Sequence, residues 1–182
     1  MTPEIPGYTA GTWTLDTVHS EVGFTVRHMM ISKVKGFFEN FSGTIVTAEN
    51  PLDSTVVATI EADSINTKNK QRDAHIQSGD FLLAEEYPQL TFNSTGVRYE
   101  KGEFFIDGDM TIRGVTKPVT LDFDLGGFSN DPSTGPRFGG TATTTINRQE
   151  FGVSFNSALE TGGVMLGDDI KITLEIAAAK VE

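Results

Sequence analysis

Apolar side chains recur at every second position in several stretches of the chain, and this period of two predicts β-strands with one buried face. The regularity is clearest over residues 170–176, where isoleucine and leucine alternate with lysine, threonine and glutamate. The other stretches are 22–26, 56–62, 104–112 and 119–125, with weaker strands at 34–47, 90–99 and 138–146. About eight strands of this kind are typical of an antiparallel sandwich or a closed barrel.

Residues 68–86 depart from this period and predict a short helical insertion. The stretch from Lys70 to Ile76 favours a helix, with Asn66 or Thr67 as its cap and Ser78-Gly79 at its end. In an antiparallel barrel, a single insertion of this kind is expected to plug or cover one end.

Composition excludes several classes of function. The chain has 182 residues and no cysteine, which excludes disulfide scaffolds, zinc ribbons, iron–sulfur clusters and cysteine nucleophiles. Its net charge of −11 disfavours nucleic-acid binding and electrostatic docking on anionic membranes. No repeat or linker divides the chain, so residues 1–182 are expected to form one domain. The N-terminal residues show no signal peptide, which predicts a cytoplasmic protein, or a periplasmic or secreted one if a leader has been removed.

Few polar residues suggest chemistry. His28 continues the even-numbered face of Phe24 and Val26, either as a core histidine or as a polar contact to a ligand. Arg72 on the insertion and Arg148 after a strand either tie the insertion to the barrel or hold the polar head of a ligand. The three histidines lack metal-ligand spacing, and nucleophile elbows and phosphate loops are missing, so neither a metal site nor catalytic residues are predicted.

Phenylalanine dominates the aromatic residues, with 13 Phe against 3 Tyr and 1 Trp. These rings supply apolar area without a hydroxyl or indole N–H that needs a partner. Because an eight-strand barrel is either filled by side chains or open to one ligand, composition leaves both interiors open.

Motifs in order along the chain resemble those of the YceI-like family. They are Trp13–His28, Val34–Phe38, Phe41–Gly43, Ser64–Thr67, Gln71–Asp73, His75-Ile76, Asp80-Phe81, Tyr87-Pro88, Thr91-Phe92, Gly108–Val119, Asn147-Arg148, Phe151–Val153 and Gly167-Asp168. The resemblance implies a lipocalin-like barrel, often dimeric, that holds a polyisoprenoid in an elongated apolar tunnel. Isoprenoid quinones and polyprenyl-phosphate-like lipids are the ligands it implies.

We therefore predict an all-β protein with a single antiparallel, lipocalin-like barrel of about eight strands. It is expected to bind, transport or sequester a long amphiphilic isoprenoid lipid without catalysis, required cofactor, nucleic acid or stable membrane insertion, and to form a homodimer. The alternative is an enzyme that converts a hydrophobic metabolite inside the same barrel. The candidate ligand-binding residues are Phe24, Val26, His28, Met30, Phe37, Phe41, Ile60, Arg72, Ile76, Phe81, Phe92, Met110, Arg148, Phe155 and Met165.

Overall fold

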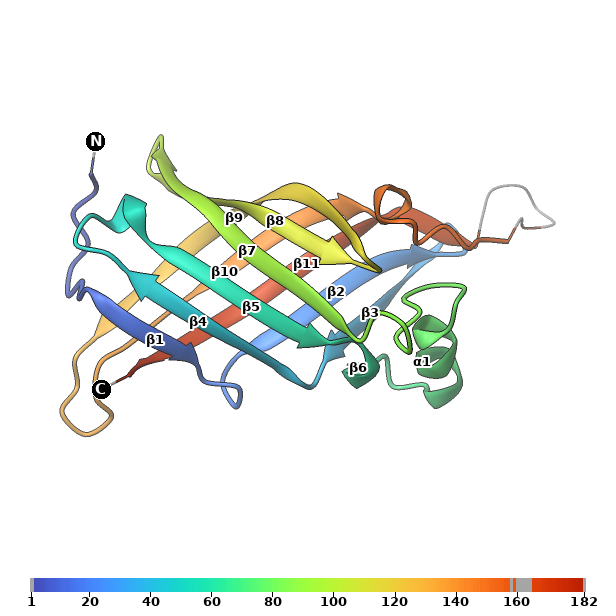
Figure 1. Ribbon diagram of the computed structural model, residues 1–182, viewed down its shortest axis with the longest axis horizontal. Helices are drawn as coiled ribbons and strands as arrows, with labels where there is room; N and C mark the ends of the chain where they lie inside the picture. Colours follow the sequence, from blue (N-terminus) through green and yellow to red (C-terminus); the bar gives the residue numbers. More distant parts are fainter. Residues whose placement is uncertain (1, 158, 160–164, 182) are drawn as a thin grey trace.

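The alternating segments pair into one antiparallel sheet that closes on itself (Figure 1). The computed structural model describes residues 2–157, 159 and 165–181. Within them the strands are β1 (Gly11–Leu15), β2 (Glu21–His28), β3 (Ser32–Phe38), β4 (Phe41–Thr47), β5 (Thr55–Glu61), β6 (Ile65–Asn66), β7 (Gln89–Glu100), β8 (Glu103–Ile112), β9 (Val115–Ser129), β10 (Arg137–Asn147) and β11 (Leu166–Lys180). Short 3₁₀ turns are η1 (Pro51–Asp53), η2 (Ala62–Ser64) and η3 (Arg148–Phe151).

Eight of these strands form the closed ring, in the order β1-β4-β5-β7-β8-β9-β10-β11 and back to β1. The strands β2, β3 and β6 extend the sheet from β11. β1 and β2 pair with different parts of the long strand β11, through Leu15↔Ala178 and Glu21↔Glu175. The prediction of an antiparallel barrel of about eight strands is confirmed.

The helical insertion is also confirmed, although its start lies later than expected. Helix α1 (Lys70–Gln77) begins at Asn69, whose side chain accepts a hydrogen bond from the backbone amide of Arg72 at 3.0 Å. Thr67, one of the two expected caps, is 4% exposed, and its hydroxyl bonds to Asp73 at 2.5 Å instead. That contact joins the start of the helix to the segment that follows β6. No helix of the described chain is long and apolar enough to span a membrane.

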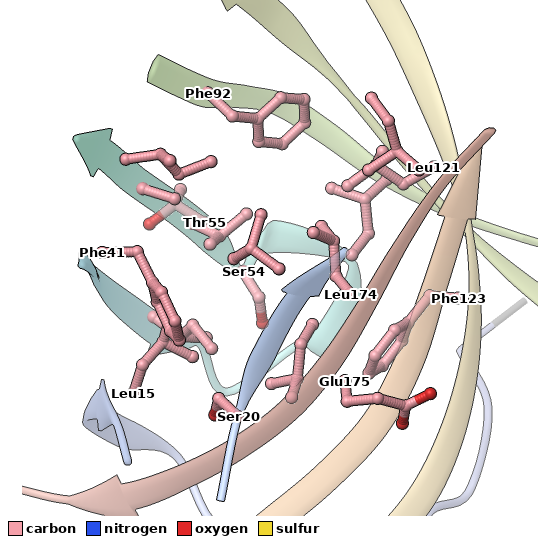
Figure 2. A pocket seen from close by; sticks show the side chains of 18 of the residues that line it. Leu15, Ser20, Phe41, Ser54, Thr55, Phe92, Leu121, Phe123, Leu174 and Glu175 are labelled. Carbon is pink, nitrogen blue, oxygen red and sulfur yellow. The ribbon is translucent and has the colours of Figure 1, made fainter. Parts of the chain in front are cut away.

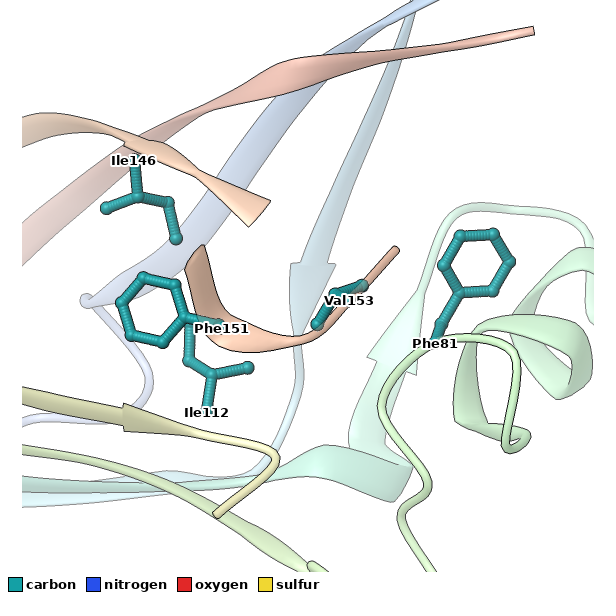
Figure 3. Close-up of a cluster of buried hydrophobic side chains, with 5 residues drawn as sticks. All are labelled: Phe81, Ile112, Ile146, Phe151 and Val153. Atoms are coloured by element: carbon teal, nitrogen blue, oxygen red, sulfur yellow. The ribbon is translucent and has the colours of Figure 1, made fainter. Parts of the chain in front are cut away.

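A buried apolar cluster closes the barrel at the end beside α1. Its members are Phe81, Ile112, Ile146, Phe151 and Val153. Figure 3 shows Ile112, Ile146 and Phe151 close together, with Phe81 on the loop that follows α1. Phe151 is 1% exposed, whereas α1 itself contributes no buried residue. The insertion therefore helps to plug the barrel through Phe81, which follows the helix, together with the η3 turn.

Aromatic rings pack across the opposite end. Trp13 is fully buried and donates its indole N–H to the hydroxyl of Thr47 at 2.7 Å. Its ring meets those of Phe138 and Phe128 edge-on at 4.8 and 5.7 Å. Tyr8, from the N-terminal segment, adds an edge contact to Phe128 at 5.2 Å. Apolar packing thus occupies both ends of the barrel.

Candidate functional site

A cavity lies inside the barrel between these two clusters. Its volume is about 210 Å³, counted as the space open to the centre of a water molecule. Every strand except β6 contributes to its wall, and the side chains are predominantly aliphatic and aromatic; Figure 2 shows Phe92, Leu121 and Leu174 among them. A space of this composition favours an apolar ligand, because burial of apolar surface contributes about 25 cal/mol to the binding free energy for each Å² removed from water.

Three phenylalanine rings lie against glycines in the barrel wall. A Cβ atom built on Gly36 would approach the Phe24 ring to 2.5 Å, and one on Gly108 would approach Phe92 to 2.4 Å. Gly140 stands in the same relation to Phe123, at 2.7 Å. All three rings line the cavity. Because glycine has no side chain, each ring can pack directly against the wall and occupies less of the interior.

The barrel wall is interrupted at the connection between β1 and β2 and at the connection between β3 and β4. The last β1–β4 pair is Thr14↔Thr44 and the first β2–β3 pair is Val22↔Phe38, and no pair of described residues continues the ladder between them. The backbone of Ala177 on β11 is satisfied there by the Ser20 hydroxyl, at 3.0 and 3.1 Å. This interruption leaves a break in the side of the barrel.

A polar groove on the outer surface meets the cavity at this break. Four residues line both spaces: Ser20, Glu21, Phe38 and Phe41. Farther out, the groove is lined by charged and polar side chains, which include Lys35, Glu39 and Lys68. The cavity therefore has a side opening, defined here by the four shared residues, where an apolar interior meets polar surroundings.

Asp16 anchors the loop between β1 and β2 next to the side opening. Its carboxylate bonds to the His19 ring at 2.7 Å and accepts a hydrogen bond from Arg137 on β10 at 3.0 Å. The pKa of Asp16 is lowered from 3.8 to about 2, and the hydrogen bond with His19 is the largest cause. Partial burial raises the pKa, whereas the hydrogen bonds from Arg137 and from the amides of Val18 and His19 lower it further.

This depressed pKa makes part of the stability of the protein dependent on pH. The ionised carboxylate stabilises the fold above pH 3.8, and the contribution is lost as pH falls through about 2. In Asp16→Asn, we expect a lower urea midpoint than in the wild type at pH 5, and a difference that narrows towards pH 2. A difference independent of pH would show that the Asp16 carboxylate is not responsible.

The structure places five of the sequence-predicted site residues on the cavity wall: Phe24, Phe41, Ile60, Phe92 and Met110. Ile76, Phe81 and Phe155 instead belong to or pack against the cluster that closes the α1 end. Whether any of these residues contacts a ligand stays a prediction.

Five other predicted residues lie away from the cavity lining. Val26 is buried within β2, and Phe37 faces the outer groove because Gly36 and Phe38 take the inward positions on β3. The alternation that aimed His28 and Met30 inward stops at the end of β2: Met30 is 50% exposed in the following turn. Met165 lies just before β11, where its carbonyl accepts a hydrogen bond from the Met29 amide at 2.6 Å.

Arg148 is held in a structural role. It is 4% exposed, and its guanidinium donates to the carbonyls of Val153 and Phe155 at 2.8 Å and of Gly167 at 2.9 Å. Burial lowers the pKa of Arg148, an effect that Asp168 opposes from 3.7 Å. Arg148 thus fastens the loop after η3 to the start of β11.

Arg72 also bonds to the chain itself. Its guanidinium donates to the Thr67 hydroxyl at 2.9 Å and to the Thr67 carbonyl at 2.7 Å. These bonds join the helix to the residue that follows β6, and whether Arg72 also contacts a ligand stays a prediction. Neither arginine lines the cavity in the described part of the chain. There is likewise no cluster of metal-ligating side chains among the described residues.

Several lining residues were not chosen from the sequence. Phe123 and Leu174 belong to the alternating stretches 119–125 and 170–176, so that period was sufficient to find them. Ser20 and Glu21 carry no such signal, because their position depends on where two strands separate.

Comparison with protein families gives a match over residues 13–178 to the model described as a YceI-like domain. Among curated relatives, the UPF0312 protein SA2479 of Staphylococcus aureus (strain N315) is 43% identical over 161 residues, covering 87% of this chain and 92% of the relative.

Solved structures share the fold. The Campylobacter jejuni YCEI protein is 32% identical, with a TM-score of 0.75 over 96% of this chain and 98% of its own. A polyisoprenoid binding domain from Saccharophagus degradans is 12% identical, with a TM-score of 0.71 over 95% of this chain and 100% of its own, a likeness of fold alone.

Proposed function

Because the chain belongs to the YceI-like family, we propose that it is a non-catalytic carrier that binds the chain of a long isoprenoid lipid in the barrel cavity. The observation that carries the proposal is the apolar cavity enclosed by the barrel strands. A prenyl chain matches such a wall because its binding needs apolar contact and no charge pairing. The polyisoprenoid binding described for the Saccharophagus degradans domain is consistent with this ligand class.

The side opening supports an orientation for the ligand. Its polar members, Ser20 and Glu21, lie next to the charged outer groove, whereas both ends of the barrel are packed with apolar side chains. A buried polar head group without partners costs free energy, so we place the head at the side opening and the prenyl chain in the cavity. An isoprenoid quinone or a polyprenyl phosphate fits this arrangement, and transport or sequestration follows from holding such a lipid in water.

Organic extraction followed by mass spectrometry tests the proposal. Protein purified without detergent is expected to release a long-chain isoprenoid, and delipidated protein is expected to bind an added prenyl quinone in a saturable manner. Ile106→Glu, which places a carboxylate on the cavity wall, is the loss-of-binding variant, and Val57→Glu, at an exposed position on the outer face of β5, is its control. No extracted lipid together with no saturable binding would refute the proposed function.

A further inference from the structure

The turn between β2 and β3 exposes three consecutive apolar side chains. Met29 is 42% exposed, Met30 50% and Ile31 84%. The other large apolar side chains that are exposed in the described chain are valines at 18, 46, 57 and 181, none of which is adjacent in sequence to another. Single exposed apolar residues are common on soluble proteins, whereas a contiguous group marks a surface that contacts something.

The backbone of this turn does not favour the residues that occupy it. Met29 and Met30 both have positive φ angles, 54° and 64°, and the Ile31 amide donates to the carbonyl of His28 at 3.3 Å. Turns with two residues in this left-handed region prefer Asn-Gly, because a side chain larger than that of glycine is strained there. Folding alone would therefore favour small residues in place of the two methionines.

Cations flank the apolar turn on the outer face of the sheet. Arg27 and Lys33 lie directly opposite each other on β2 and β3, and like charges in that position repel. Lys35 on β3 and Lys171 on β11 both lie opposite Thr25. None of these four cations forms an ion pair among the described residues.

Acidic residues are scarce around this hairpin. The seventeen residues 22–38 contain no Asp or Glu, in a chain that has 25 of them. The carboxylates on the neighbouring part of β11 are those of Asp168 and Asp169, and Asp168 already contacts Arg148 and Gln149. The hairpin is thus a basic and apolar projection on a protein whose net charge is −11.

We propose that the β2–β3 hairpin docks reversibly on a bilayer that contains anionic phospholipids. The apolar turn enters the interfacial region of the bilayer, and the four cations contact the phosphate groups. The acidic remainder of the surface is repelled, which fixes the orientation and keeps the association weak. The negative net charge of the whole protein disfavours binding to anionic membranes. The net charge does not reveal that the hairpin itself is positively charged.

The cationic face of the hairpin extends towards the side opening, which lies at the end of the hairpin opposite the apolar turn. Lys35 belongs to both the cationic face and the outer groove that leads to the side opening. β3 continues from there to Phe38, which lines the cavity. The proposal goes beyond the proposed function and does not depend on it, because docking uses side chains outside the cavity.

Co-sedimentation of the full chain with vesicles tests the docking. The wild type is expected to bind vesicles of phosphatidylcholine with phosphatidylglycerol at least tenfold more tightly than vesicles of phosphatidylcholine alone, and to be released by salt. Met29→Asn/Met30→Gly removes the apolar turn but suits the backbone, so we expect at least a tenfold loss of binding with an unchanged or higher Tm. Val18→Asn/Val57→Ser, which removes two exposed valines outside the hairpin, is the matched control and should bind normally.

The cations are tested in the same way. Lys33→Glu/Lys35→Glu is expected to abolish the preference for phosphatidylglycerol, whereas Lys70→Glu/Lys117→Glu, with the same change of charge elsewhere, should lower binding much less. Equal binding by the Met29/Met30 variant and the wild type, or no preference for anionic vesicles, overturns the docking. Extraction of the same preparations separates the two proposals: a lipid-loaded protein that ignores vesicles overturns docking alone, and a vesicle-binding protein without lipid overturns the proposed function alone.

Discussion

Arg148→Met is expected to lower the free energy of unfolding by about 3–5 kcal/mol, because it leaves buried polar groups without their donor. Three main-chain carbonyls, those of Val153, Phe155 and Gly167, accept hydrogen bonds from this one guanidinium. These acceptors belong to the main chain, so no side-chain substitution removes them. An apolar replacement of similar length therefore leaves them without a donor and lowers the stability of the fold. The urea midpoint at pH 7 measures the effect.

Arg98 provides the matched control for Arg148. It is also held by several acceptors, in this case the carboxylates of Asp107 at 2.7 Å and Glu100 at 3.0 Å, but its side chain is 41% exposed on the outer face of the barrel. Water solvates the carboxylates when the arginine is removed, so Arg98→Met is expected to cost less than about 1 kcal/mol. Equal losses in the two variants would mean that burial of Arg148 contributes nothing to its effect.

Gly36→Ala is expected to weaken binding of a prenyl quinone by roughly 10- to 100-fold, the equivalent of about 1.4–2.8 kcal/mol. The added methyl group would lie 2.5 Å from the Phe24 ring and 2.8 Å from the Thr67 methyl group. Thr67 is fixed by its bonds to Asp73 and Arg72, so the ring has to give way. Because Phe24 lines the cavity, its displacement takes up space that the ligand needs.

A second substitution separates lost space from general damage. Gly36→Ala/Phe24→Leu is expected to regain much of the binding, because the smaller side chain leaves room for both the methyl group and the ligand. Gly96→Ala is the control, since no atom lies within 4 Å of its added Cβ. Titration of delipidated protein gives the affinities, and wild-type affinity in Gly36→Ala would show that the ring does not set the width of the cavity.

The sequence was sufficient to predict the barrel, but it predicted only part of the cavity wall. The period of two identified Phe24 and Phe92 as inward residues, since the strand pairing is in register on both sides of each. It failed at Phe37 because β3 and β4 use opposite parities: Phe38 faces inward on β3 and Phe41 on β4, with Glu39 and Asn40 between the strands. A change of this kind moves every following side chain to the other face.

The polar residues were harder to assign for a different physical reason. Arg148 and Arg72 bond mainly to main-chain carbonyls or to a threonine close in sequence, and such partners leave no pattern that distinguishes them from ligand-binding arginines. Glycines within strands commonly mark bends or bulges. A bulge does occur between Gly139 and Gly140, whereas Gly36 makes room for a ring from the paired strand.

Apolar packing at both ends of the barrel has a consequence for which lipids it can carry. A prenyl tail that enters from the side meets the Phe151 cluster in one direction and the Trp13 cluster in the other, and we expect these side chains to limit how far the tail extends. Each additional buried CH₂ contributes about 0.8 kcal/mol until the space is full, and further units must remain in water. The affinity of the protein for a prenyl lipid should therefore rise with the number of isoprene units and then level off. The closed barrel would thus discriminate among lipids by the length of their chains.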